Sequence, residues 1–330
     1  MPTRRTFCLA AMAAAPLAGF ARPAAAASAA GDYPTRAIKM VVGFPAGQST
    51  DTSARQVAQS MTQTLGQPVY VDNRPGAAGM ISHEAVKNAA PDGYTLLMGS
   101  TGTLAINPSL YRKMSYDPLR DFEPVALVSA SPLVLFVAAD SPLKSFKDLR
   151  ELAKSRPGKV SYGSSGSGTT GHIAMEMLKK EAGLDLLHVP YKGSPPMMTD
   201  VIGGQVDLAF DTAGSVLPMA RNGRVRILGV ASLKRLPQAP EIPTLAQQGL
   251  PGFEAVPWSA ILAPRGTPAA VVQRLNEAVN AALKDPAVLE QFSTTGSYAL
   301  GGSARELQLH MQKEHALWGK AVALSGAQVD

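Results

Sequence analysis

The sequence predicts an α/β protein with two domains, each a mostly parallel sheet flanked by helices. Short β-rich runs alternate with helical patterns along most of the chain, which favours parallel strands joined by crossover helices. Two glycine-rich turns, Gly43–Asp51 and Tyr162–His172, each follow a β-rich run and open a helical pattern. The turns lie about one domain length apart, and 330 residues suffice for two domains.

The first thirty residues have the pattern of a cleaved secretory signal. Arg4 and Arg5 precede an apolar run, Cys8–Phe20, which is too short to span a membrane. An Ala-rich stretch places the cleavage site near Ala27. The arginine pair with Phe7 resembles a twin-arginine signal, but a Sec signal also begins with arginine, so both export routes remain open.

The composition is that of an ordinary globular protein with little net charge. Apolar residues make up 45% and charged residues 17% of the sequence. Residues 1–30 hold three arginines and no acids, so their removal lowers the formal charge from +6 to +3. This charge is too small and too scattered to indicate nucleic-acid binding. The single cysteine, Cys8, lies in the signal, so the mature chain offers no disulfide, thiol nucleophile or thiolate metal site.

The first predicted domain begins at residue 31 and runs to residue 125. Its apolar periodicity predicts three strands and two helices in alternation: Ala37–Phe44, Thr50–Leu65, Pro68–Asp72, Ile81–Ala90 and Tyr94–Gly99. This βαβαβ rhythm favours a parallel sheet with helices on both faces.

The second predicted domain covers residues 126–232. The long apolar run Val125–Ala139 is expected to be a strand that crosses into it, and Ser145 is expected to cap the next helix. The remaining elements alternate again: Ser145–Ser155, Lys159–Tyr162, Thr170–Ala182, Leu186–Tyr191, Pro196–Ile202, Val206–Asp211, Ser215–Asn222 and Val225–Ser232.

Residues 233–330 are expected to return to the first domain. They hold a predicted strand at Ser259–Ala263 and three amphipathic helices at Pro268–Lys284, Pro286–Thr294 and Ser303–Leu324. A first domain that is completed by the C-terminal segment is the arrangement of a hinged, clamshell binding protein.

Both glycine-rich turns have the chemistry of an anion site. A helix that starts after a strand leaves unpaired backbone N–H groups in its first turn, where the helix dipole is positive. Glycine allows close backbone approach, and Ser/Thr hydroxyls add donors. In α/β sheets ligands bind at the carboxyl ends of strands, where both turns lie. The sequence therefore predicts one anion-binding cleft between two turns, with ordinary βα turns capped by Ser/Thr as the alternative.

Other motifs carry weaker signals. Gly166–Gly171 fits the dinucleotide pattern G-x-G-x-x-G, but Tyr191-Lys192 stands where an acid should end the next strand. No G-x-S-x-G elbow supports serine hydrolysis. His310 and Glu314 have i, i+4 spacing without a third ligand, so a solvated helix face is expected. No catalytic residue, metal ligand or cofactor is predicted.

Four polar residues near the turns are considered with two interpretations each. His172 either touches the ligand or makes a hydrogen bond at the helix start. Asp211 either binds a ligand hydroxyl or amine or caps the next helix. Lys192 either pairs with a carboxylate or is an exposed turn residue. Asp51 is expected to be a first-turn residue favoured by the helix dipole rather than a ligand contact.

A series of short motifs occurs along the mature chain in a fixed order. They are Tyr33-Pro34, Ile38–Asp51, Gly66–Pro68, Asn73–Gly76, Ala90–Thr95, Ile106–Pro108, Tyr116–Pro118, His188–Gly193, Gly203–Asp207 and Leu250–Phe253. In this combination the chain resembles the Bug receptors, the periplasmic substrate-binding proteins of tripartite tricarboxylate transporters. The resemblance covers essentially all of the mature chain.

The resemblance implies a two-domain, type II-like periplasmic-binding-protein clamshell that closes on a small organic carboxylate without catalysis. It implies a monomer that serves membrane transporter subunits or a sensor, with no nucleic acid and no cofactor. The implied ligand-binding residues lie in the first turn, on a floor, in the second turn and at the distal end: Phe44, Ala46, Gly47, Gln48, Ser49 and Thr50; Ser100, Thr101 and Thr103; Ser164, Gly166, Ser167, Gly168 and Thr169; Lys192 and Asp211.

One residue of the first turn departs from the family pattern. The family often has a glycine run before Thr-Asp, whereas this chain has Gly47-Gln48-Ser49. The bulky amide of Gln48 changes the space near the ligand, so the identity of the acid is not carried over. A secreted cofactor-dependent enzyme that uses the Gly166–Gly171 turn is the alternative hypothesis.

Overall fold

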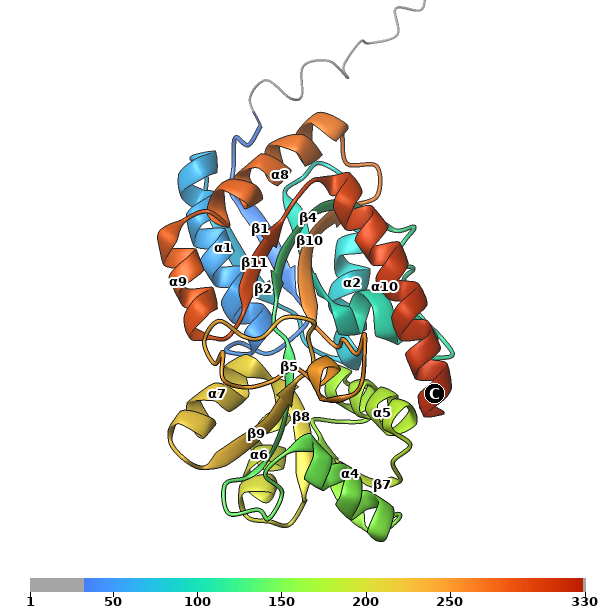
Figure 1. Ribbon diagram of the computed structural model, residues 1–330. Coiled ribbons are helices and arrows are strands. Elements are labelled where there is room, and N and C mark those ends of the chain that lie inside the picture. Colours follow the sequence, from blue (N-terminus) through green and yellow to red (C-terminus); the bar gives the residue numbers. More distant parts are fainter. Residues whose placement is uncertain (1–32, 329–330) are drawn as a thin grey trace, which may run out of the picture. The chain divides into compact units, whose positions relative to one another are not determined.

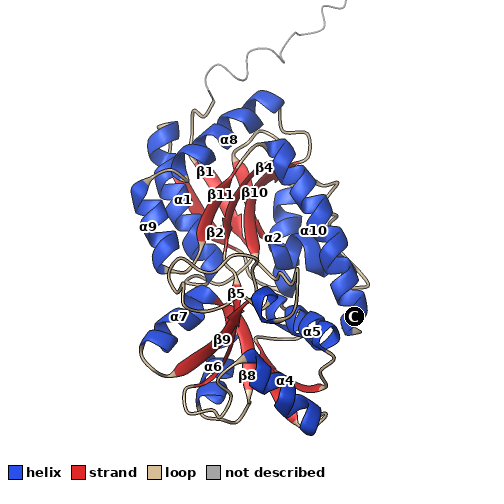
Figure 2. Ribbon diagram, in the orientation of Figure 1, coloured by secondary structure: helices blue, strands red, loops and turns tan. Residues whose placement is uncertain are grey.

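The computed structural model describes residues 33–328, so the predicted signal lies outside the described residues. From Pro34 onward the chain forms one compact unit. It contains two mixed β-sheets with helices around them (Figure 1 and Figure 2). Within this described part, no helix combines the length and the apolar character needed to cross a membrane.

The first sheet contains the strands that precede and follow the first glycine-rich turn. Its strands are β1 (Ile38–Val42), β2 (Val69–Asn73), β3 (Thr95–Ser100), β4 (Phe122–Ala130), β10 (Trp258–Pro264) and β11 (Tyr298–Gly301). Their order in the sheet is β11-β4-β10-β3-β1-β2. β2 and β3 pair with β1 in parallel, whereas β10 and β11 pair antiparallel with their neighbours.

The second sheet holds the strand that precedes the second glycine-rich turn. Its strands are β5 (Leu133–Ala138), β6 (Val160–Ser164), β7 (Leu186–Pro190), β8 (Leu208–Thr212) and β9 (Val225–Val230). Their order is β7-β6-β8-β5-β9. β6 pairs in parallel with β7 and β8, and β5 pairs antiparallel with β8 and β9.

Both sheets are mixed rather than mostly parallel, because the chain passes between them and returns. It leaves the first sheet along β4 and enters the second along β5, and it comes back from β9 to β10. The outgoing and returning strands are neighbours in each sheet, so they run antiparallel. The parallel pairing expected from the βαβ rhythm is confined to β1–β3 and to β6–β8.

The apolar run Val125–Ala139, predicted as one strand, is two strands in different sheets. Pro132 separates β4 from β5 and has no N–H group to donate to a ladder. The neighbouring Ser131 N–H donates to the Pro257 carbonyl of the returning segment at 2.9 Å. The chain changes sheets between β4 and β5 and again after β9. The proposed domain limits at residues 125 and 232 stay a prediction.

The helices pack around these strands, and most begin and end within a few residues of the predicted limits. Their bounds are α1 Ser49–Leu65, α2 Met80–Lys87, α3 Asn107–Leu110, α4 Phe146–Ser155, α5 Thr170–Ala182, α6 Ser194–Ile202, α7 Ala213–Arg221, α8 Ala269–Ala282, α9 Pro286–Thr294 and α10 Ala304–Ser325, with short turns η1 Ala77–Gly79, η2 Gly102–Ile106 and η3 Ala246–Gln248. The sequence interpretation missed β11, η2 and α3, which are too short for a clear periodicity.

A buried carboxylate replaces the solvated helix face predicted for α10. Glu314 is only 8% exposed, and its Oε2 accepts hydrogen bonds from the indole N–H groups of Trp258 at 3.0 Å and Trp318 at 2.9 Å. Buried indoles require such an acceptor, which explains why α10 places a charged residue inside. Both tryptophans are themselves buried, so all three side chains lie inside the protein.

Candidate ligand-binding site

The first turn is held by a carboxylate from the helix that it opens. Gly47 has a left-handed backbone (φ +86°), and its N–H donates to Asp51 Oδ2 at 2.8 Å. Asp51 also accepts from Arg55 Nε at 3.0 Å and, through Oδ1, from Asn73 Nδ2 at 2.8 Å. Burial alone would raise the pKa of Asp51, but hydrogen bonds from Arg55, Gly47 and Asn73 and the charge of Arg55 hold it below its ordinary value. The carboxylate is therefore ionised.

The second turn is held in the same way by an imidazole. Gly168 has φ +79°, and its N–H donates to His172 Nδ1 at 3.0 Å. A backbone N–H can only donate, so Nδ1 carries no proton and the neutral ring has its proton on Nε2. Burial, together with the neighbouring charges of His188 and Lys179, lowers the pKa of His172 to about 4, although Glu176 acts in the opposite direction. The ring is therefore neutral at physiological pH.

The two helix starts share one backbone geometry. Gln48 precedes α1 with φ −75° and ψ 160°, and Thr169 precedes α5 with φ −68° and ψ 160°. Neither side chain caps its helix. Side-chain caps occur at α4, α9 and α10, whereas α2, α3, α6, α7 and α8 also begin without one. What α1 and α5 share besides the missing cap is the positive-φ glycine just before the helix, whose N–H is held by the third helical residue.

The predicted residues of the first turn lie at the surface. Ala46, Gly47, Gln48 and Ser49 are exposed, and Phe44 and Thr50 are partly buried. Exposure suits groups that would meet a ligand from solvent.

The second turn is more deeply seated. Ser167 is exposed and Gly166 is partly buried, but Ser164 and Gly168 are buried. The Ser164 hydroxyl contacts Gly166 O at 3.1 Å and His188 Nε2 at 2.7 Å, and the Thr169 hydroxyl donates to Gly166 O at 2.8 Å. The hydroxyls of Ser164 and Thr169 and the Gly168 N–H hold the turn in shape.

The predicted floor residues are also engaged within the protein. Thr101 Oγ1 accepts from the Trp258 N–H at 2.7 Å and donates to the Trp258 carbonyl at 3.2 Å. Thr103 Oγ1 accepts from the Ser100 N–H at 3.0 Å. Both threonines are buried, and their hydroxyls organise the start of η2.

The second turn also packs against the helix that follows this floor. A side chain added to Gly168 would collide with Leu110 of α3. The structure thus brings the second turn together with the segment after β3.

The predicted distal residues differ in burial. Lys192 is exposed, which agrees with a turn residue. Asp211 is buried at the end of β8, where one oxygen accepts from the Thr212 N–H at 2.7 Å and the other has no partner. Burial raises the pKa of Asp211, although the nearby Ser194 and the Thr212 N–H act against the rise. Asp211 therefore keeps one acceptor open.

Sequence reasoning missed the supports of both turns. Arg55 follows Asp51 at i+4, a spacing that signals a helical ion pair. Asn73 ends β2, beside β1, and also donates to the Phe44 carbonyl at 3.0 Å. His188 gave no local signal, because its role depends on the pairing of β7 with β6.

The Gly166–Gly171 turn lacks two features of a dinucleotide site. β7 ends at Pro190 without an acid, and the N–H of Gly168 is already engaged by His172, which argues against a dinucleotide at the Gly166–Gly171 turn. Within residues 33–328, no group of three or more His, Cys, Asp or Glu side chains is placed to hold a metal ion.

Comparisons with known proteins agree with this geometry. The tripartite tricarboxylate transporter family receptor, TctC, matches residues 53–326. Protein BugT of Bordetella pertussis (strain Tohama I) is 37% identical over 313 residues, which cover 94% of this chain and 95% of BugT.

Two solved structures are also similar. One is R. palustris Rpa4515 with adipate, with 38% identity and a TM-score of 0.82 over 90% of this chain and 100% of that one. The other is MatC (Rpa3494) from Rhodopseudomonas palustris with bound malate, with 33% identity and a TM-score of 0.77 over 88% and 100%. These findings confirm the predicted two-domain α/β clamshell class, with mixed sheets in place of mostly parallel ones, and the resemblance to the Bug receptors. The chain belongs to the family of tripartite tricarboxylate transporter receptors.

Proposed function

We propose that this chain is a periplasmic solute receptor that captures a small organic carboxylate and presents it to the membrane subunits of a tripartite transporter or to a sensor. It acts as a monomer without catalysis. The N-terminal signal directs export and is cleaved near Ala27. The adipate and malate held by the two similar structures support a carboxylate as the ligand class.

The observation that carries the proposal is the pair of uncapped helix starts. The first N–H groups of α1 and α5 have no intrahelical acceptor, and the helix dipole adds positive potential there. A carboxylate that accepts these N–H groups forms charge-assisted hydrogen bonds, each worth about 1.5–3 kcal/mol in net terms. We infer that Ser49 and Thr50 of α1 and Thr170 and Gly171 of α5 supply these donors.

A thermal-shift screen tests the proposal. Mono-, di- and tricarboxylates are compared with their amides and with neutral sugars. A ligand that binds only the folded state adds about 2.7 kcal/mol of stability at a hundredfold excess over its dissociation constant. At least one acid should raise the melting temperature, while its amide should not. A screen in which no acid stabilises the protein, or in which the amides act equally well, contradicts the proposal.

A further inference from the structure

We propose that His172 is a positioning residue of the ligand site, which fixes the second turn through a neutral acceptor where Asp51 fixes the first turn through a carboxylate. The inference rests on the proposed function, because it concerns the turn that would hold the ligand. It goes further by assigning different electrostatic roles to two side chains that need not touch the ligand.

The geometry of the two turns shows that these side chains are equivalent. Asp51 and His172 are each the third residue of their helix, and each accepts the N–H of the glycine four residues earlier. The distances are 2.8 and 3.0 Å, and both glycines have positive φ. The same backbone hydrogen bond is therefore made once by an anion and once by a neutral ring.

The neighbours of the two acceptors explain the difference. At the first turn, Arg55 lies 3.0 Å from Asp51 and compensates its charge. At the second turn, Lys179 is already paired with Glu176 at 2.8 Å, so it would not be available to a carboxylate at position 172. A neutral acceptor holds the second turn without placing an uncompensated negative charge beside an anionic ligand.

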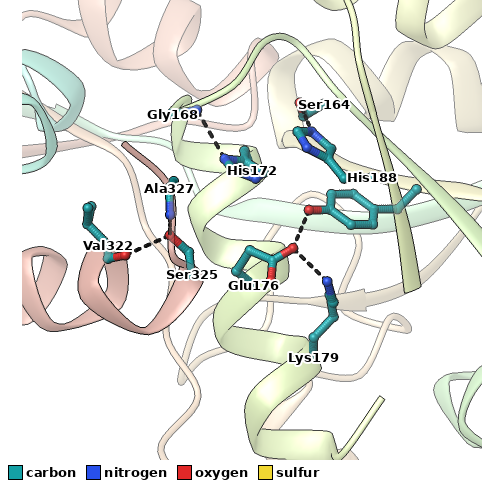
Figure 3. A network of polar contacts seen from close by, with 10 residues as sticks. Ser164, Gly168, His172, Glu176, Lys179, His188, Val322, Ser325 and Ala327 are labelled. Atoms are coloured by element: carbon teal, nitrogen blue, oxygen red, sulfur yellow. Dashed lines mark hydrogen bonds and ion pairs between the residues drawn. The ribbon is translucent and has the colours of Figure 1, made fainter. Parts of the chain in front are cut away.

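Among the described residues, the acid and the lysine that act on His172 lie on its own helix. The groups that face His172 are Glu176 and Lys179 on its own helix, Tyr162 from β6 and His188 from β7. Figure 3 also draws Val322, Ser325 and Ala327 of the α10 segment, whose hydrogen bonds join only one another. The named neighbours of His172 are thus one internal ion pair and two aromatic rings.

A stack of rings keeps the imidazole in place. His188 lies over His172 with ring centroids 4.1 Å apart and planes 16° apart (Figure 3). Tyr162 stacks on His188, with ring centroids 4.8 Å apart. The Nε2 atom of His188 is hydrogen-bonded to the Ser164 hydroxyl, which in turn contacts the Gly166 carbonyl. Two histidines from different elements therefore support two glycines of one turn.

Three substitutions at one position separate shape from charge. His172→Asn offers an amide oxygen close to the place of Nδ1 and stays neutral. His172→Asp offers a charged oxygen there, as in the first turn. His172→Leu keeps apolar bulk without any acceptor. Circular dichroism and thermal melts of each purified mature protein establish that it is folded.

Calorimetric titration with adipate, malate and citrate then measures binding. Loss of the acceptor in His172→Leu should weaken binding about tenfold, because one hydrogen bond that orders the turn is lost. His172→Asn should restore binding to within about threefold of the unchanged protein. A merely structural role for the ring would not be rescued by the smaller amide.

The Asp variant tests the charge. His172→Asp should bind about tenfold more weakly than His172→Asn at about 0.01 M salt, and the gap should shrink at about 1 M salt, where screening acts within a few ångströms. Equal affinities of Asn and Asp variants at low salt, or unchanged affinity of a folded Leu variant, overturns the inference. If the Leu variant does not fold, the Asn and Asp pair still decides. Failure of the unchanged protein to bind any of the acids instead overturns the proposed function, and the inference falls with it.

Discussion

The two glycine-rich turns have the same backbone but different surroundings. At the first turn the glycine is exposed and its acceptor is an ion pair, Asp51 with Arg55. At the second turn the glycine is buried against Leu110 and its acceptor is a stacked neutral imidazole. The shape of such a turn therefore needs only a positive-φ glycine and an acceptor in the first helical turn. Its charge and its tolerance to change are set by the side chains around it, such as Arg55 at the first turn and Leu110 at the second.

Acidification should have the largest effect, because the imidazole of the second turn titrates in a different pH range from the carboxylate of the first. Burial lowers the pKa of both His83 and His172 from 6.5 to about 4. The pKa of Asp51 is also lowered, so this carboxylate stays ionised at a pH below its ordinary pKa. Below pH 6.5 the unfolded chain protonates these histidines while the folded chain does not until about pH 4. The free energy of unfolding should therefore fall as pH decreases across this window, by about 3 kcal/mol per histidine. Urea unfolding at several pH values between 7.5 and 4 measures the fall.

The matched variant for this prediction is His172→Asn. It removes one of four histidines whose pKa is lowered by burial, so its free energy of unfolding should fall by about 3 kcal/mol less over the same pH range. The same decrease in both proteins would show that His172 does not titrate as its burial implies.

Alanine at the two glycines should separate the turns by their surroundings. Both substitutions force a side chain into positive φ, which costs about 1 kcal/mol. A Cβ at Gly47 meets nothing within 4 Å, whereas one at Gly168 collides with Leu110. Gly168→Ala should therefore lose about 3 kcal/mol, once overpacking is added, and Gly47→Ala about 1. Chemical denaturation measures both, and equal losses would mean that the second turn is not confined by α3.

Removal of the cation near each acceptor tests whether a charge must be compensated at the first turn but not at the second. Arg55→Met takes the compensating group from Asp51, whereas Lys179→Met takes the partner of Glu176 and leaves His172 neutral. Because Arg55 is half exposed, its removal should cost about 1 kcal/mol of stability. Carboxylate affinity should fall more in Arg55→Met than in Lys179→Met, as calorimetry would show. A larger loss in the lysine variant would contradict the assigned roles.

The residues before the two helices should give the smallest effects. Thr169 donates its hydroxyl to the Gly166 carbonyl, so Thr169→Val should lose about 1 kcal/mol of stability. Gln48 is exposed and makes no capping bond, so Gln48→Ala should change stability by less than about 0.5 kcal/mol. Thermal melts check both values, and a carboxylate screen of Gln48→Ala should show a changed order of preferred acids.

Local patterns predicted the parts of the molecule that depend on nearby residues. The strands before both turns, the starts of α1 and α5 and the Ser145 cap of α4 follow from glycine placement, apolar periodicity and hydroxyl chemistry. The first-turn role of Asp51 followed from the helix dipole, and its position in α1 confirms it.

Features that depend on distant partners could not be predicted. The burial of Glu314 is explained by Trp258, which lies 56 residues away, and the role of His188 by Ser164 of a different strand. The change of sheet at Pro132 depends on the returning segment after β9. For His172 the sequence left two interpretations open, and only the distance to the Gly168 N–H favours the hydrogen bond at the helix start.

A crystal structure of the purified protein with an acid from the screen tests the central claim most directly. Carboxylate oxygens should lie about 3 Å from backbone N–H groups at the start of both α1 and α5. The N–H groups of Gly47 and Gly168 should keep their hydrogen bonds to Asp51 and His172. A carboxylate bound elsewhere, such as in the groove that Arg55, Gln59 and Tyr70 line between α1 and β2, would contradict it.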